Sequence, residues 1–198
     1  MTDHKPDTPD PEEADAEEAD AEESAGLACI LSFNANDPSG AGGLTCDATA
    51  MASVGEHCLP VCTGAYVRDT SSITDFFALD DEAVHDQARA VAEDVPVQVI
   101  KVGFVGTPEN LAIIAELADD YEGVPVVAYM PNLSWWEDDK IDAYLDAFRE
   151  LLLPQTSVLV GHHSTLRRWL LPDWSGERNP GPRDIAKAAA ELGVPFTL

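Results

Sequence analysis

The sequence predicts a three-layer α/β fold, in which helices cover both faces of a mainly parallel sheet. Short apolar runs rich in β-branched residues alternate with segments that repeat an apolar residue every three or four positions, as strands joined by helices do. The runs are apolar throughout, which is typical of strands buried on both faces. Ligands bind such sheets beyond the carboxyl ends of the strands, so the loops after the strands are the candidate sites.

Five apolar runs are predicted to be strands. They lie at residues 28–33, 58–67, 97–103, 124–130 and 157–160. The loops that follow them, and that we expect to carry any site, are 34–43, 67–72, 103–107, 129–137 and 161–165. Residues 194–198 begin what looks like one more strand. Because a domain seldom ends within a buried strand, we expect the sequence to be incomplete at its C-terminus.

Helices are predicted wherever the apolar spacing is three and four. An Ala-rich segment ends near Gly55, and longer periodic segments cover 81–95, 107–121, 138–153 and 182–192, with a short helix around 167–169. The second periodic segment has clear start signals, because Thr107 can cap it and Pro108 suits the first helical position. Pro154 is expected to end the third.

Composition divides the chain into an acidic tail and one domain. Residues 1–26 hold eleven of the 37 acidic residues and no large apolar run, so we expect a disordered tail there and a single domain over 27–198. The net charge of −26 argues against nucleic acid and against an anionic membrane surface as partners. The four cysteines follow no signal peptide, which favours reduced thiols in the cytoplasm.

The loop after the first strand reads Asn34-Ala-Asn-Asp-Pro-Ser-Gly-Ala-Gly-Gly43 and leads into the Ala-rich segment. It is not a P-loop, because no Lys-Ser/Thr follows the glycines, and it lacks the G-x-G-x-x-G spacing of dinucleotide sites. Glycines at a helix start still let a ligand approach backbone N–H groups. Local chemistry therefore leaves two interpretations open, a plain turn or a binding loop.

The same stretch, continued to Asp47, resembles the Asp-Pro-Ser-Gly-Gly-Ala-Gly-Ile-x-x-Asp loop of the hydroxymethylpyrimidine/phosphomethylpyrimidine kinases, a family of the ribokinase-like superfamily. Further segments match in order, namely Val61-Cys-Thr-Gly-Ala65, Val99-Ile-Lys-Val-Gly103 and Leu152-Leu-Pro-Gln155. The resemblance implies a ribokinase-like sandwich. It also implies transfer of the ATP γ-phosphoryl group, with Mg²⁺, to hydroxymethylpyrimidine or its phosphate in thiamine biosynthesis.

The resemblance also implies which residues meet a small-molecule substrate. Arg68 stands where the family has Gln or Glu, and Phe104 replaces a Met of its pocket wall. A guanidinium suits phosphate or carboxylate, so the preferred ligand can differ. The expected substrate-binding residues are Ala35, Asp37, Gly40, Asp47, Arg68 and Phe104.

Departures from the family concern the phosphate side and the catalytic end. His162 and Thr165 occupy the positions of the family's Asn-x-x-Glu, so we place both on the nucleotide side and assign no residue as a metal ligand. The family's Gly-rich catalytic motif lies beyond the matched region. We therefore assign no catalytic residue and expect the 198-residue chain to be inactive by itself.

Three questions stay open at this stage. The protein can be a kinase of hydroxymethylpyrimidine, a divergent paralogue that binds a phosphorylated small molecule without catalysis, or a kinase of a pyridoxal-like alcohol. Trp135 and Trp136 either line a ligand pocket or pack as a loop lid. The oligomeric state is also open, with a homo-oligomer among the options.

Overall fold

The computed structural model describes residues 27–176 and 178–198. The expected tail at 1–26 lies outside the described residues. Seven strands form one sheet in the order β3-β2-β1-β4-β5-β6-β7. All neighbours are parallel except β2 and β3, which pair antiparallel. The strands are β1 (Cys29–Asn36), β2 (His57–Arg68), β3 (Ile73–Ala78), β4 (Val99–Val102), β5 (Val126–Met130), β6 (Val158–Gly161) and β7 (Phe196–Thr197).

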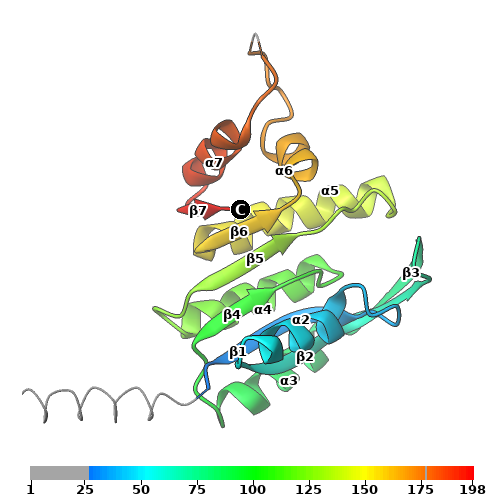
Figure 1. Ribbon diagram of the computed structural model, residues 1–198, viewed down its shortest axis with the longest axis vertical. Coiled ribbons are helices and arrows are strands. Elements are labelled where there is room, and N and C mark those ends of the chain that lie inside the picture. The colour runs from blue at the N-terminus through cyan, green and yellow to red at the C-terminus, as the bar shows by residue number, and fades with distance from the viewer. Residues whose placement is uncertain (1–26, 177) are drawn as a thin grey trace, which may run out of the picture.

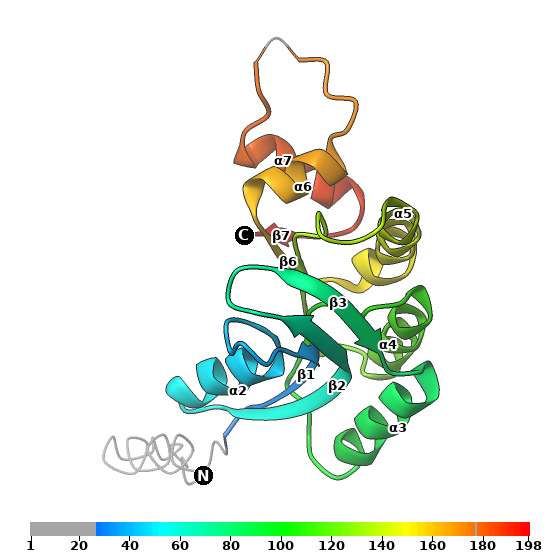
Figure 2. The ribbon, with the colours of Figure 1, turned by 90° about the vertical axis from the view of Figure 1, so that its right-hand side faces the viewer.

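Helices lie on both sides of this sheet, as the sequence predicts. Figure 2 shows α2 on one side of β1 and β2, with α3, α4 and α5 together on the other side. The α6 and α7 helices lie at the β6–β7 end of the sheet (Figure 1). The helices are α2 (Gly43–Ser53), α3 (Asp81–Ala92), α4 (Pro108–Asp120), α5 (Asp138–Ala147), α6 (His163–Leu170) and α7 (Pro182–Glu191).

The helix signals in the sequence have visible counterparts. Thr107 caps α4 by accepting a hydrogen bond from the Asn110 N–H, and Pro108 is the first helical residue. The helix predicted over 138–153 forms but changes geometry, because α5 passes into a π-helical turn at Phe148–Leu152 and a short 3-10 turn at Leu153–Gln155. Pro154 cannot donate the backbone hydrogen bond that a continuing α-helix needs.

The core lies between the sheet and the α3–α4–α5 layer. Its largest side chains, all essentially inaccessible to solvent, include Tyr144, Phe33, Phe104, Phe148, Leu31, Ile100, Leu111 and Ile114. By contrast, no residue of α2 is buried. Leu44, Ala48 and Met51 of α2 are only half-buried, so this helix gains less from apolar burial than the α3–α4–α5 layer does.

Strand β3 was not predicted. It forms a hairpin with β2, and three hydrogen bonds to the Asp69 carboxylate from Ser71 and the Ser72 backbone, at 2.7–2.8 Å, close its turn. Only two of its six residues, Ile73 and Phe76, are even partly buried, so β3 lacks the apolar run that marks the other strands. Its pairing with the edge of the sheet explains why it is a strand nonetheless.

Candidate functional site

The order in which successive strands are added to the sheet reverses at β1. From β1 the chain moves outward to β2 and β3, and it then returns to β4 on the opposite side of β1. In open α/β sheets a crevice forms beyond the carboxyl ends of the strands at such a reversal. The structure has a cavity of about 240 Å³ there, which we call the switch-point pocket.

The switch-point pocket draws its lining from four strand ends. The contributions come from the end of β1 and the loop after it, the end of β2, the second residue after β4, and the end of β5 and the loop after it, together with the first residue of β3. The lining residues are Asn34, Asp37, Ala41, Gly42, Gly43, Tyr66, Arg68, Ile73, Phe104, Tyr129, Pro131, Asn132 and Trp135.

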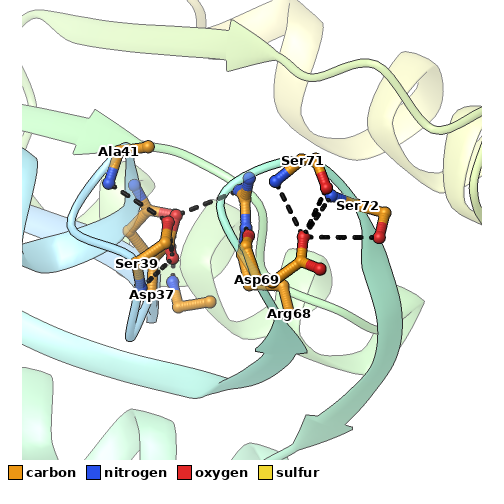
Figure 3. Close-up of polar contacts among 9 residues, drawn as sticks. Asp37, Ser39, Ala41, Arg68, Asp69, Ser71 and Ser72 are labelled. Carbon is orange, nitrogen blue, oxygen red and sulfur yellow. Dashed lines mark hydrogen bonds and ion pairs between the residues drawn. The ribbon is translucent and has the colours of Figure 1, made fainter.

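An ion pair joins two walls of the pocket. Arg68 Nη1 lies 3.1 Å from Asp37 Oδ2, and the two side chains are only 17% and 2% exposed (Figure 3). The other Asp37 oxygen accepts hydrogen bonds from the N–H and the hydroxyl of Ser39, at 2.8 and 2.6 Å. Because Asp37 is paired, the Arg68 charge is compensated within the pocket. The pair also ties the loop after β1 to the β2–β3 hairpin.

Aromatic rings form the other wall. Tyr66 stacks on Phe104 with ring centroids 5.8 Å apart, and Trp135 meets both rings edge-on. Phe104 is held in place by its backbone, since Thr63 Oγ1 donates a hydrogen bond to the Phe104 carbonyl at 3.0 Å. Such an array accepts a flat ring by stacking or edge contact.

The Tyr66 phenol is the titratable group of this aromatic wall. Burial, and after it the nearby Tyr144 and Asp37, raise the pKa of Tyr66 well above its ordinary value. The phenol therefore stays protonated at neutral pH. It offers a ligand a hydrogen-bond donor and is not a base.

The structure brings three of the six expected substrate-binding residues to the pocket and places the other three elsewhere. Asp37, Arg68 and Phe104 line it. Ala35 is completely buried within β1, and Gly40 lies in the turn that precedes α2, where its N–H donates to the Asp37 carbonyl.

Asp47 lies in a polar network beneath α2. Its Oδ2 accepts hydrogen bonds from Ser32 Oγ at 2.9 Å, from Asn34 Nδ2 at 2.9 Å and from Lys101 Nζ at 2.6 Å. Three donors from β1 and β4 therefore converge on one carboxylate oxygen of α2. In the structure Asp47 anchors this helix to the sheet.

The two residues expected on the nucleotide side lie together in the first turn of α6, where the Thr165 N–H donates a hydrogen bond to the His162 carbonyl at 2.9 Å. His162 is the N-cap of α6, and its Nδ1 accepts a hydrogen bond from the Ser164 N–H at 3.3 Å. Thr165, one turn further, lines two cavities beside the loop after β5. His162 is thus exposed but engaged with its own helix, and Thr165 is half-buried and lines both cavities.

Several pocket residues were not singled out from the sequence. Tyr66 could have been found, because it precedes Arg68 by two positions on β2 and residues at that spacing share one face of a strand. Trp135 had been left open between a pocket wall and a lid, and it lines the pocket. Tyr129 lies within β5, and Asn132, in the loop after this strand, carries no sequence signal beyond that place.

The described residues contain no metal cage and no membrane helix. Within 27–176 and 178–198, no three His, Cys, Asp or Glu side chains converge to hold a metal. This donor set does not fit an ion held by the protein alone. The helices described are also too short or too polar to cross a bilayer.

A family model described as phosphomethylpyrimidine kinase matches residues 37–193. The chain belongs to this family. A hydroxymethylpyrimidine/phosphomethylpyrimidine kinase from Streptomyces coelicolor is 25% identical over 82% of the chain and 59% of its own length. The corresponding protein of Mycobacterium bovis is 28% identical over 85% of the chain and 62% of its own length. The chain thus spans about 60% of the curated relatives that it matches.

Solved structures confirm the fold expected from the resemblance. A phosphomethylpyrimidine kinase from Clostridium difficile superimposes with a TM-score of 0.73, at 20% identity, over 86% of this chain and 76% of the other. A Staphylococcus aureus pyridoxal kinase, solved with AMP-PCP and pyridoxal, gives 0.72 at 17% identity over 86% of this chain and 61% of the other. At these identities the comparisons establish the three-layer phosphomethylpyrimidine kinase fold and nothing finer.

Proposed function

We propose that the protein phosphorylates hydroxymethylpyrimidine, its phosphate, or both, with ATP as donor, as a step of thiamine biosynthesis. The family match and the relatives' names support this reaction. The single observation that carries the proposal is the switch-point pocket, in which the family's Asp-Pro-Ser-Gly loop forms one wall and aromatic rings form another.

The charge of the pocket favours a neutral ring over a strongly anionic ligand. Arg68 is the cation of the pocket lining, and its partner Asp37 is almost fully buried and offsets its charge. A compensated guanidinium still donates hydrogen bonds to ring nitrogens or to a hydroxymethyl oxygen. It attracts a dianionic phosphate much less than an unpaired guanidinium would. Within the proposal, this arrangement favours hydroxymethylpyrimidine over its phosphate as the acceptor.

Mg²⁺ is expected with the nucleotide. In phosphoryl-transfer sites this ion is held largely by phosphate oxygens and water, with one or two carboxylates from the protein. The reaction depends mainly on positioning and charge neutralisation. The described residues contribute the substrate pocket and its donors, and we assign no catalytic base among them.

A pyridoxal-like alcohol is the second candidate substrate, because a compact heteroaromatic ring with a hydroxymethyl group meets the same pocket requirements. The likeness of the fold to pyridoxal kinase supports the comparison. The pocket walls of Tyr66, Phe104 and Trp135 would accept either ring.

The test is a substrate panel with Mg·ATP. The natural gene product is assayed for ADP formation with hydroxymethylpyrimidine, hydroxymethylpyrimidine phosphate and pyridoxal, and the products are identified by mass spectrometry. Preferred turnover of either pyrimidine supports the proposal, and preference for pyridoxal replaces it with the second candidate. Absence of turnover with every alcohol, together with tight binding of a phosphorylated compound, would favour the non-catalytic paralogue. The same assay on the 198-residue chain tests the expectation that it is inactive.

A further inference from the structure

A second cavity, which we call the basic cavity, lies between the loop after β5 and the α6 helix. Its volume is about 580 Å³, more than twice that of the switch-point pocket. Amide, hydroxyl and guanidinium groups dominate its lining, which consists of Asn132, Ser134, Ser164, Thr165, Arg167, Arg168, Leu171 and Pro172.

The charge of the basic cavity is opposite to that of the chain. The sequence has 37 acidic and 11 basic residues, yet two adjacent arginines line this cavity. Over 27–176 and 178–198, no carboxylate is among the lining residues, and neither Arg167 nor Arg168 takes part in an ion pair. Two guanidinium groups without an ion-pair partner, on an otherwise acidic surface, attract anions.

The position of the basic cavity suits a group that reacts with a ligand in the switch-point pocket. Asn132 lines both cavities, so they are neighbours at the loop after β5. Phosphoryl transfer requires the donor phosphate to lie beside the acceptor hydroxyl. The switch-point pocket compensates its own charge through Asp37 and Arg68, which leaves the phosphate charge to be neutralised elsewhere.

We infer that the basic cavity binds the polyphosphate of the phosphoryl donor, with Arg167 and Arg168 as its cationic ligands. This inference rests on the proposed function. Guanidinium groups bind phosphate oxygens in pairs of parallel hydrogen bonds, and the Thr165 and Ser134 hydroxyls can donate to the same oxygens. The arginines would neutralise phosphate charge alongside the Mg²⁺ that is expected with the nucleotide.

A third cavity, of about 470 Å³, limits where the anion can lie. It shares Ser134, Thr165 and Arg168 with the basic cavity but is also lined by the carboxylates of Asp138 and Asp142. These carboxylates repel a polyphosphate. The anion is therefore expected in the basic cavity and not in this third one.

The test measures binding of inorganic tripolyphosphate by calorimetry, in the absence of ATP and of any acceptor. Arg167→Ala and Arg168→Ala should each weaken binding about tenfold or more, because each removes charge-assisted hydrogen bonds to phosphate. Arg183→Ala is the matched control, since Arg183 is an exposed arginine at the start of α7 and lines neither cavity. Equal binding by all three variants would overturn the inference.

Two further arms separate this inference from the proposed function. Orthophosphate should bind at least about tenfold more weakly than tripolyphosphate, because one phosphate engages fewer donors; equal binding would assign the cavity to a monophosphate and overturn the donor assignment. In turnover, Arg168→Ala should raise the KM for ATP and leave the KM for the pyrimidine unchanged. If no pyrimidine is turned over, the proposed function is wrong. The tripolyphosphate measurement still supports or overturns the assignment of the basic cavity, because it requires neither an acceptor nor turnover.

Discussion

The nearly buried carboxylate of Asp37 and the guanidinium of Arg68 lie 3.1 Å apart, across 31 residues of sequence. Arg68 also donates from Nε to the Asp69 carbonyl at 2.9 Å, and Asp69 in turn closes the β2–β3 turn (Figure 3). Asp37 is fixed on its other side by Ser39. The substrate-side loop and the hairpin are therefore held as one unit by a chain of charged and hydrogen-bonded groups.

The first prediction concerns the strength of this pair. A double-mutant cycle with Asp37→Asn and Arg68→Gln should give a coupling energy of about 1–3 kcal/mol in urea unfolding, because both side chains are largely shielded from water. The matched control is Arg89 with Asp120, whose side chains are 30% and 49% exposed. That pair should give less than about 1 kcal/mol. Equal coupling in the two cycles would contradict a special role for Asp37.

The second prediction separates a structural from a substrate-binding role for Asp47. Asp47→Ala removes the acceptor shared by Ser32, Asn34 and Lys101 and leaves a largely buried ammonium group without its partner. The free energy of unfolding should fall by about 2–3 kcal/mol. The KM for the pyrimidine should change by less than about twofold, corresponding to under about 0.4 kcal/mol.

A second variant keeps this test informative. Asp47→Leu combined with Lys101→Met replaces the ion pair by apolar groups and should recover part of the lost stability. A large rise in KM with an unchanged unfolding free energy would instead place Asp47 against the substrate.

The third prediction uses two glycines of the loop after β1. Gly40 and Gly43 both have positive φ, +70° and +63°, but a Cβ at Gly40 meets nothing within 4 Å, whereas at Gly43 it would lie 2.4 Å from the Ala35 carbonyl oxygen. Gly40→Ala should therefore cost about 1–2 kcal/mol of backbone strain. Gly43→Ala adds a backbone clash and should cost at least about 2 kcal/mol more. Thermal unfolding of both variants measures the difference, and equal costs would contradict the close approach at Gly43.

Much of the fold could be predicted because its signals are local. Continuous apolar runs form the strands β1, β2, β4, β5 and β6. Thr107 and Pro108 mark the start of α4 in the sequence. The sequence does not predict β3, because this strand is stabilised by pairing with β2 and has no apolar run of its own. Local patterns reveal burial on two faces better than they reveal pairing at an edge.

The location of the site could be predicted from the sequence, but the contacts among its residues could not. Loops after parallel strands had been singled out, and the switch-point pocket lies among them. The partners within it depend on contacts that no spacing rule provides, such as Asp47 with Lys101 across 54 residues. The place of Arg168 in a cavity could not be predicted, because only the fold brings α6 beside the loop after β5 and encloses a cavity between them.

The last prediction follows from the buried phenols. Burial raises the pKa of both Tyr66 and Tyr144 in the folded protein, whereas an unfolded tyrosine titrates near about 10. Above that pH the unfolded chain has lost protons that the folded protein retains, so the free energy of unfolding should fall as pH rises. Each phenol contributes up to about 1.4 kcal/mol per pH unit. Urea unfolding between pH 8 and about 11 measures this slope. Tyr66→Phe and Tyr144→Phe should each make it shallower and the double variant shallower still, and an unchanged slope in Tyr66→Phe would show that this phenol ionises equally well in the folded protein.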